Sequence, residues 1–176
     1  MGTLIFVLGG AQSGKSRFAL SLAKNGKGRA AFIATCLPSD MEMNEKISRH
    51  KKERPKNWVT VEAGLTPFHM TSPKSKIDSV LIDSLTLWVA RCLEKGWGRE
   101  EIEKKAKKFL VSIKKKFNHI VIVSDEVGLS IVPGVRSARN FRVCLGEINQ
   151  LFAKNSDCFY MVFAGVPVCV KGENYE

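Results

Sequence analysis

A glycine-rich stretch near the start of the chain constrains the fold most strongly. Residues 9–16 read Gly-Gly-Ala-Gln-Ser-Gly-Lys-Ser and fit the phosphate-loop pattern G-x-x-x-x-G-K-[ST]. An apolar run, residues 4–8, precedes this stretch, and apolar residues at helical spacing follow it. Strand, loop and helix in this order predict a nucleotide-binding loop, because loop N–H groups and the positive end of the helix dipole both face phosphate oxygens.

The residues of the loop have different expected tasks. Lys15 is expected to reach the β- and γ-phosphates and to stabilise charge on the transferring group, which makes it a catalytic candidate. Ser16 is expected to place its hydroxyl on Mg²⁺. The residues expected to bind the nucleotide here are Gly9, Gly10, Ala11, Gln12, Ser13, Gly14, Lys15 and Ser16.

The rest of the chain alternates apolar strands with helical patterns. Strands are predicted at residues 4–8, 30–34, 58–61, 79–83, 119–123 and 158–164. Alternation of this kind predicts an α/β fold with a mostly parallel sheet, covered by helices on both faces, and with ligands outside the carboxyl ends of the strands. The helix that starts at Lys15 is expected to end in a left-handed pair, Asn25-Gly26. A capping box at residues 39–42 predicts a helix toward Glu53.

Length and composition predict one globular domain over residues 1–176, since the chain shows no repeat, low-complexity tract or linker. No apolar run approaches the roughly 18 residues that span a membrane, and the N-terminus enters a strand without a basic leader, so we expect a cytoplasmic protein. The five cysteines are an odd number without a C-x-x-C pair. They indicate reduced, mostly buried thiols rather than disulfides or a zinc site.

The net charge of +11 raises the question of a nucleic-acid partner. Residues 99–117 explain much of it, because their apolar positions recur at helical spacing and leave most lysines on the solvent side. The lysines in question are Lys104, Lys105, Lys107, Lys108, Lys114, Lys115 and Lys116. No interleaving of aromatic and basic residues accompanies the charge, so we expect no nucleic-acid partner.

Acidic residues follow two of the predicted strands. Phosphoryl transfer needs a carboxylate opposite the loop serine, to hold Mg²⁺ or its waters. Asp83, after residues 80–82, fits this task, while Asp125 and Glu126 end another strand and compete for it. The alternative for Asp83 is N-capping of the next helix, although Ser84 is as good a cap.

A basic segment, residues 46–55, contains a second catalytic candidate. His50 shares the apolar face of its predicted helix, and spacing alone favours a packed, hydrogen-bonded side chain. Its cationic neighbours favour the neutral imidazole and suit phosphate binding; they are Arg49, Lys51, Lys52 and Arg54. A neutral imidazole is able to attack phosphorus as a nucleophile.

Together these residues resemble the bifunctional adenosylcobinamide kinase/adenosylcobinamide-phosphate guanylyltransferases of cobalamin biosynthesis. The resemblance covers nearly the whole chain. Its motifs are the loop at 9–16, Phe32-Ile33-Ala34-Thr35, His50-x-x-x-Arg54-Pro55-x-x-Trp58, Glu62, Leu81-Ile82-Asp83, Glu126-Val127-Gly128, Ile131-Val132-Pro133, Arg139-x-Phe141-Arg142, Asn149-Gln150, Gly165, Pro167 and Lys171.

The resemblance implies a function in two steps. A phosphoryl group passes to the aminopropanol hydroxyl of adenosylcobinamide, and GMP from GTP is then attached to that phosphate with release of pyrophosphate. It implies that His50 carries a covalent GMP, that Thr35 and Glu62 help to hold the guanine nucleotide, and that the fold is a RecA-like phosphate-loop NTPase forming a trimer. In this interpretation Lys51 and Arg54 bind nucleotide phosphates.

Three positions depart from the family pattern. Gln12 stands where an arginine is common, Asp125 where an asparagine precedes Glu-Val-Gly, and Val143 where an aspartate is usual. Val143 removes a carboxylate from a region that we associate with the corrinoid or with a subunit contact.

The sequence therefore predicts a Mg²⁺-dependent transferase that uses ATP and GTP and acts on a corrinoid, in which Ser16 and Asp83 hold the metal. Two other function classes stay open. A simple small-molecule kinase would use the loop and Asp83 without a covalent intermediate. A RecA-like nucleic-acid ATPase would use the positive charge for phosphate contacts.

Overall fold

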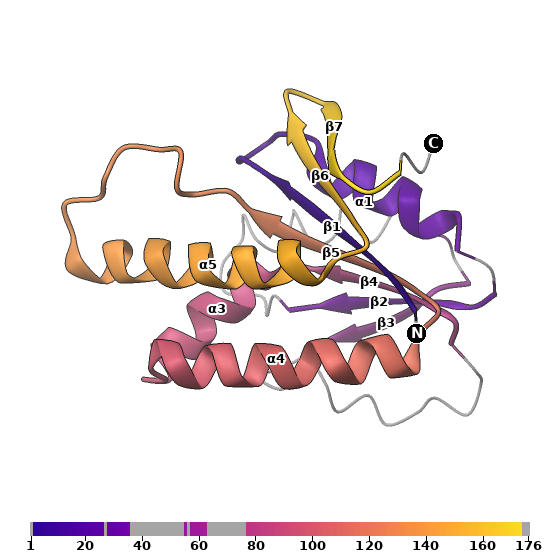
Figure 1. The fold of residues 1–176 in the computed structure, drawn as a ribbon, viewed down its shortest axis with the longest axis horizontal. Helices are drawn as coiled ribbons and strands as arrows, with labels where there is room; N and C mark the ends of the chain where they lie inside the picture. Colours follow the sequence, from indigo (N-terminus) through magenta and orange to yellow (C-terminus); the bar gives the residue numbers. More distant parts are fainter. Residues whose placement is uncertain (1, 27, 36–54, 56, 63–76, 174–176) are drawn as a thin grey trace.

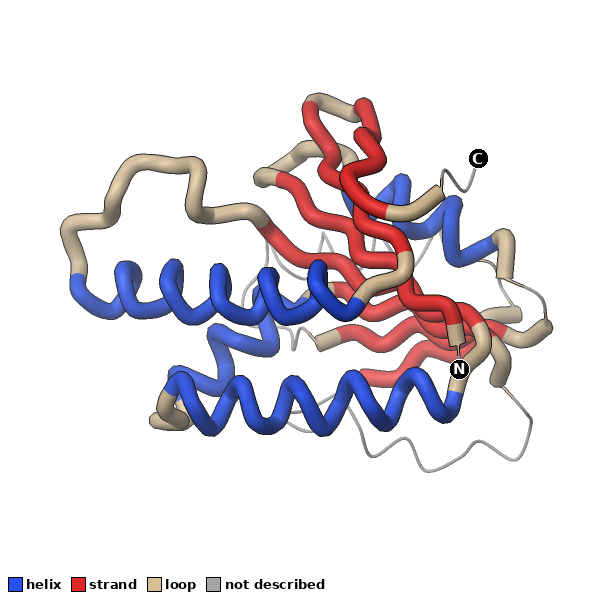
Figure 2. Tube along the Cα trace, in the orientation of Figure 1, coloured by secondary structure: helices blue, strands red, loops and turns tan. Residues whose placement is uncertain are grey.

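Apolar runs of the sequence form the strands of one sheet, with helices packed on it (Figures 1 and 2). The computed structural model describes residues 2–26, 28–35, 55, 57–62 and 77–173. In chain order the elements are β1 (Thr3–Gly9), α1 (Lys15–Lys24), β2 (Ala30–Ala34), β3 (Val59–Glu62), β4 (Ser79–Asp83), α3 (Leu85–Glu94), α4 (Arg99–Lys116), β5 (His119–Asp125), α5 (Arg136–Asn155), β6 (Cys158–Phe163) and β7 (Val166–Lys171).

The seven strands of the described sheet follow the order β3-β2-β4-β5-β1-β6-β7. All neighbouring pairs are parallel except β6 and β7. The register places Gly9 opposite Asp125, and places Ala34 opposite both Asp83 and Glu62. The carboxyl ends of β1 to β5 therefore share one edge, and β5 lies between the loop strand β1 and the strand β4 that ends in Asp83.

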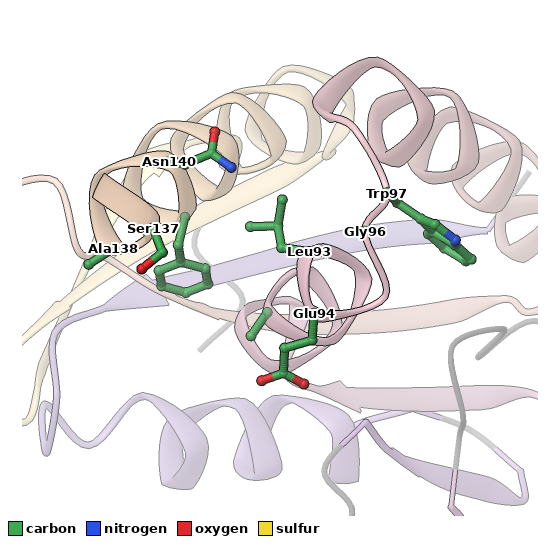
Figure 3. A pocket seen from close by; sticks show the side chains of 9 residues that line it. Leu93, Glu94, Gly96, Trp97, Ser137, Ala138 and Asn140 are labelled. Carbon is green, nitrogen blue, oxygen red and sulfur yellow. The ribbon is translucent and has the colours of Figure 1, made fainter. Parts of the chain in front are cut away.

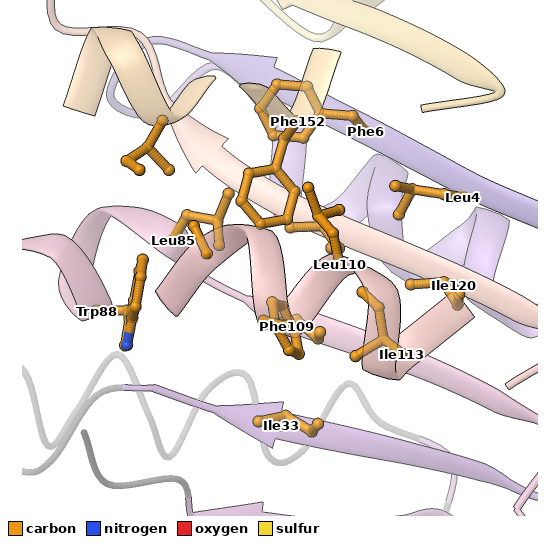
Figure 4. Packing of buried hydrophobic residues seen from close by; sticks show 14 of the residues in the cluster. Leu4, Phe6, Ile33, Leu85, Trp88, Phe109, Leu110, Ile113, Ile120 and Phe152 are labelled. Atoms are coloured by element: carbon orange, nitrogen blue, oxygen red, sulfur yellow. The ribbon is translucent and has the colours of Figure 1, made fainter. Parts of the chain in front are cut away.

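Two apolar layers hold the helices to the sheet, which confirms the predicted α/β fold. On one face, α3, α4 and α5 pack through Trp88, Phe109 and Phe152 onto the sheet (Figure 4). On the other face, α1 packs through Ala19 and Leu22 onto β4, β5 and β6. Both layers are built from residues that lie at 3.6-residue spacing on the helices and in continuous apolar runs on the strands.

The predicted lysine-rich helix is confirmed as α4. The apolar residues at helical spacing are buried, with Ile102 and Ala106 completely enclosed and Phe117 at 7% exposure just beyond the helix. Lys107 and Lys108 are exposed, and Lys107 pairs with Glu103 at 2.6 Å. An exposed pair of this kind contributes little stability, so this face of α4 behaves as a solvated surface.

Reversing the charge of Lys107 and Lys108 tests this interpretation of α4. The double change to glutamate should leave turnover nearly unaltered, because both side chains are solvated and neither belongs to the loop or the carboxyl edge. Steady-state rates of the double variant and of the wild-type protein provide the measurement. A large loss of activity in a folded double variant would show that this face contributes to substrate binding.

The prediction that the sheet ends with a strand at 158–164 was wrong. β6 ends at Phe163, and the chain turns back through Ala164 (φ 48°) and Gly165 (φ 87°) into the antiparallel strand β7. Positive φ at both turn residues is typical of a two-residue hairpin turn. Pro167 is tolerated within this strand because β7 lies at the edge of the sheet.

The expected left-handed end of the first helix was also wrong. Asn25 has right-handed angles (φ −74°), and Gly26 does not have a positive φ. Gly26 is instead required by close packing: a Cβ there would lie 2.2 Å from Ser79 Oγ and 2.9 Å from His119 Cδ2. The helix predicted toward Glu53 lies outside the described residues.

The described cysteines are free thiols, and three of them are buried: Cys92, Cys144 and Cys158. Burial raises the pKa of Cys92 to about 12 and that of Cys144 to about 11, so both stay protonated at neutral pH. Cys158 and Cys169 face each other across β6 and β7, with their sulfur atoms 4.0 Å apart. Among the described helices, none has both the length and the apolar character that crossing a membrane requires.

Candidate active site

The glycine-rich loop wraps closely over the carboxyl end of β1. Gly14 adopts a left-handed conformation (φ 89°) and immediately precedes Lys15, the first residue of α1. A Cβ on Gly9 would lie 2.6 Å from Ser13 Oγ and 2.8 Å from the Val162 carbonyl oxygen, so only glycine fits there. Lys15 Nζ donates to the Gly10 carbonyl at 3.1 Å, across the loop. The strand–loop–helix arrangement expected from the motif is therefore present.

The turn between β6 and β7 is in direct contact with the glycine-rich loop. The Gly165 N–H donates to the Ser13 carbonyl at 2.8 Å. The position that a Cβ would take on Gly14 is 3.3 Å from Gly165 Cα, so the two glycines meet backbone to backbone. The hairpin that the sequence analysis missed thus contributes a hydrogen bond to the glycine-rich loop.

Ser13 has an unusual side chain for a residue inside this loop. It is 7% exposed, and its hydroxyl oxygen is the one buried side-chain polar atom without a hydrogen-bond partner in the described part of the chain. Leaving a buried hydroxyl unpaired costs about 1–3 kcal/mol. The Ser13 hydroxyl donates to no group among the described residues. Its place in the phosphate loop suits it to donate a hydrogen bond to a phosphate oxygen.

Replacing Ser13 by alanine should therefore act in opposite directions on stability and on binding. The nucleotide-free protein should become more stable by about 1 kcal/mol, because the unpaired hydroxyl is removed. Nucleoside triphosphate affinity should fall about tenfold or more, because a hydrogen bond to a charged phosphate is lost. Denaturant unfolding without nucleotide and calorimetric titration with nucleotide measure the two effects. Lower stability together with unchanged affinity would contradict this role.

Lys15 makes an ion pair with Asp125, one of the two carboxylates that compete with Asp83 as candidates for the Mg²⁺ site. Lys15 Nζ lies 2.5 Å from Asp125 Oδ1, and the two side chains are 12% and 28% exposed. Sheet register accounts for the contact, because Asp125 is directly opposite Gly9, where the loop begins. The N–H of Glu126 also donates to the Gly9 carbonyl at 3.0 Å, which extends the pairing by one residue.

A buried polar network fixes the end of β5. The Ser124 hydroxyl donates to Asn149 Oδ1 at 2.7 Å, and Asn149 Nδ2 donates to the Asp125 carbonyl at 3.1 Å. The Asp125 N–H donates to the Thr86 hydroxyl at 2.8 Å. Thr86, Ser124 and Asn149 thereby tie α3, β5 and α5 together around Asp125. Sequence analysis gave Asn149 no role, although an asparagine on the apolar face of a helix, four residues after Leu145, is a signal of such a network.

Asp83 ends β4 and is not the N-cap of α3, because Ser84 occupies that position without a side-chain capping bond. Thr35 fixes this turn from the neighbouring strand. Its hydroxyl donates to the Ser84 carbonyl at 2.6 Å and accepts from the Ser84 N–H at 2.8 Å, while the Thr35 N–H donates to the Asp83 carbonyl at 3.3 Å. Arg91 donates to the Thr35 carbonyl at 3.0 Å.

Glu126, the other acidic candidate for the Mg²⁺ site at the end of β5, forms hydrogen bonds within the loop that follows it. Its Oε1 accepts from the N–H groups of Gly128 and Leu129, the latter at 3.1 Å. Two arginines of α5 hold the same loop: Arg142 donates to the Gly128 carbonyl at 2.5 Å, and Arg139 donates to the Pro133 carbonyl at 3.0 Å. The carboxylate of Glu126 therefore orders the segment between β5 and α5 and is a poor metal-ligand candidate.

A hollow of about 610 Å³ lies where the end of α3 and the following turn face the start of α5 (Figure 3). Leu93, Trp97 and Phe141 supply apolar walls, and Glu94, Ser137 and Asn140 supply polar groups. None of the loop residues lines it. It is therefore separate from the phosphate loop, although α5 begins beyond the carboxyl edge of the sheet (Figure 1).

Comparison with known families identifies the chain. Residues 5–170 match the model of the CobU family, described as cobinamide kinase / cobinamide phosphate guanyltransferase. The chain belongs to this family. It is 32% identical over 168 residues to the bifunctional adenosylcobalamin biosynthesis protein CobP of Pseudomonas aeruginosa, covering 95% of this chain and 96% of the relative. It is 31% identical over 181 residues to the bifunctional adenosylcobalamin biosynthesis protein CobU of Salmonella typhimurium, covering 96% and 99%.

Membership in the CobU family confirms the resemblance inferred from the motifs. It places the chain among the cobinamide kinases and cobinamide-phosphate guanylyltransferases of cobalamin biosynthesis, and it confirms the phosphate-loop fold. It also decides between the function classes that the sequence analysis left open, against the simple small-molecule kinase and the RecA-like nucleic-acid ATPase.

Two of the residues expected to handle the guanine nucleotide, Glu62 and Thr35, lie at the carboxyl ends of neighbouring strands. Glu62 ends β3, four strands away from β1, which is about 19 Å at the usual spacing of about 4.8 Å between strands. Thr35 immediately follows β2 and is 1% exposed, with its hydroxyl already paired to Ser84, so direct contact with a nucleotide stays a prediction. His50, Lys51 and Arg54 lie outside the described residues.

The oxygen ligands at this edge fit the chemistry of Mg²⁺. Mg²⁺ usually keeps several waters and binds one or two protein oxygens together with substrate phosphates. Ser16 lies in the first turn of α1, and Asp83 lies at the end of β4, two strands from β1. A hydroxyl and a carboxylate at one sheet edge provide that kind of donor set. When bound, the ion would neutralise charge on the phosphates.

Proposed function

We propose that this CobU-family chain phosphorylates the aminopropanol hydroxyl of adenosylcobinamide, with ATP or GTP as donor, and then transfers GMP from GTP to the new phosphate. The observation that carries the proposal is the phosphate loop itself. It combines the left-handed Gly14, the helix that begins at Lys15 and the unpartnered Ser13 hydroxyl at the carboxyl edge of a parallel sheet. Ligands of open α/β sheets bind at that edge.

In the kinase step, the loop N–H groups and the residues Gly9, Gly10, Ala11, Gln12, Ser13 and Gly14 enclose the triphosphate. Lys15 stabilises the charge that develops on the transferring phosphoryl group. Ser16 and Asp83 would hold Mg²⁺, which would neutralise charge on the phosphates. Thr35 supports this arrangement indirectly, because its hydroxyl fixes Ser84, the residue that follows Asp83.

In the guanylyl step, a neutral His50 attacks the α-phosphorus of GTP. A phosphorus–nitrogen bond forms, the bond to the β-phosphate oxygen breaks, and pyrophosphate leaves. An oxygen of adenosylcobinamide phosphate then attacks the same phosphorus and releases the histidine, which gives adenosylcobinamide-GDP. Lys51 and Arg54 bind the nucleotide phosphates, and Glu62 helps to hold the guanine nucleotide.

We also propose that the chain acts in the cytoplasm as a homo-oligomer, with a trimer expected from the family resemblance. The support is an apolar surface at the loop before α5. Leu129, Ile131, Val132 and Val135 are 65–92% exposed there, and the family position that usually carries aspartate is Val143, 47% exposed. Large exposed apolar patches mark protein interfaces. Sedimentation should give three times the mass of the chain, and a monomer at micromolar concentration would contradict this assembly.

Product analysis tests the proposed function. The purified protein is incubated with adenosylcobinamide, Mg²⁺ and ATP, and GTP is added in a second stage. The first stage should yield adenosylcobinamide phosphate. The second should yield adenosylcobinamide-GDP and one pyrophosphate per product. A phosphorylated product that never receives GMP would restrict the chain to the kinase step, and no product in either stage would contradict the proposal.

A further inference from the structure

The ion pair between Lys15 and Asp125 occupies the group that is expected to bind phosphate. The ammonium of Lys15 has two oxygen partners, Asp125 Oδ1 at 2.5 Å and the Gly10 carbonyl at 3.1 Å. Its side chain is only 12% exposed, so solvent screens the pair weakly. Asp125 therefore neutralises the cation on which the loop depends.

The Asp125 backbone is held in place from three sides. Its N–H donates to Thr86, its carbonyl accepts from Asn149, and its strand register aligns it with Gly9. Moving the carboxylate far from the loop would break these contacts, so only side-chain rotation can withdraw it from Lys15. Because side-chain rotation leaves the Asp125 backbone in place, the carboxylate remains near the loop even after a nucleotide has displaced it from Lys15.

Two effects of Asp125 on nucleotide binding have the same sign. Before binding, its carboxylate competes with the phosphates for the Lys15 ammonium. After binding, the same negative charge lies beside the negative phosphate oxygens and repels them. Both effects weaken the affinity for a nucleoside triphosphate.

We propose that Asp125 is an affinity-determining residue of the nucleotide site, an internal anion that a triphosphate must displace from Lys15. The inference rests on the proposed role of Lys15 in binding nucleotide phosphates. It gives a physical meaning to the departure of this chain from the Asn-Glu-Val-Gly pattern, because an asparagine at position 125 keeps the shape of the side chain without its charge.

The alternative role for Asp125 is that of a Mg²⁺ ligand, and it predicts the opposite sign. A metal ligand binds the nucleotide complex more tightly through the ion, so its removal weakens binding, and only when Mg²⁺ is present. An internal competitor weakens binding both with the metal and without it. The sign of the change and its dependence on Mg²⁺ separate the two roles.

The test measures the affinity of the full-length protein for guanosine 5′-(β,γ-imido)triphosphate by calorimetry, with Mg²⁺ and with a chelator. Asp125→Asn should bind about tenfold more tightly in both conditions, the size typical of one contact to a charged group. Asp125→Ala should shift affinity in the same direction. Glu103→Gln removes the same charge from an exposed position on α4 and should change affinity less than about twofold.

Each result of this experiment has one meaning. Tighter binding in both conditions supports the competitor role, because damage to the loop would weaken binding instead. Unchanged or weaker binding by folded Asp125 variants overturns it, and a loss confined to Mg²⁺ identifies a metal ligand. Lys15→Ala is measured alongside. If it binds the analogue as tightly as the wild-type protein, the loop assignment itself fails, whatever Asp125 does.

Discussion

Replacing Lys15 by alanine should lower the rate of cobinamide phosphorylation by at least about a hundredfold, as expected for removal of a positioned electrostatic stabiliser. The reason lies in the position of Lys15 at the start of α1. The side chain of Lys15 is only 12% exposed, so its ammonium lies in a mostly enclosed position beside the loop N–H groups. In a site partly shielded from water, one charge has a large effect on a transition state.

Lys24→Ala is the matched control for this variant. Lys24 lies on the same helix in its last turn, and its side chain is exposed. It should retain the wild-type rate, whereas Lys15→Ala should lose activity while its thermal unfolding stays cooperative. Undiminished kinase activity in a folded Lys15→Ala protein would end the assignment of residues 9–16 as the catalytic phosphate loop.

Replacing His50 by asparagine should abolish guanylyl transfer and leave cobinamide phosphorylation intact. The reason is chemical: an imidazole is available in its neutral form near pH 7, whereas a lysine in water, with a pKa of about 10.4, is almost wholly protonated. We therefore expect Lys51 and Lys52 to be poorer nucleophiles than His50. Separate assays of phosphate transfer and of GMP transfer on the same protein samples provide the measurement.

A neighbouring lysine, Lys52, supplies the control for the histidine variant. Lys52→Gln changes a neighbouring residue without removing the imidazole and should retain guanylyl transfer. If His50→Asn keeps guanylyl transfer, or if it loses both half-reactions together, the two steps do not divide between His50 and the phosphate loop as proposed.

Much of the framework around the site was predictable from local sequence signals. Residues 4–8 and 80–82 are continuous apolar runs of the kind found in doubly covered parallel strands, and they lie in β1 and β4. The loop motif specified its own position, because its chemistry requires a strand before it and a helix after it. The apolar spacing over residues 99–117 predicted α4 and its solvated lysine face.

The rest depended on contacts between distant segments, which local patterns do not contain. Asp125 and Lys15 are 110 residues apart, and only the pairing of β1 with β5 makes them an ion pair. The hydrogen bond from Gly165 to Ser13 depends on the β6–β7 hairpin, which the sequence analysis did not predict. The support of Asp125 by Asn149 depends on how α5 packs onto β5, since a helical pattern gives a face but not its partner.

The most direct test of the central claim is the intact mass of the wild-type protein after incubation with GTP and Mg²⁺. A chain that forms the covalent intermediate should gain the mass of one GMP and release one pyrophosphate, and peptide mapping without acid should place the adduct on His50, since a phosphorus–nitrogen bond to imidazole is acid-labile. An unchanged mass, or an adduct on Lys51 or Lys52, would contradict the account.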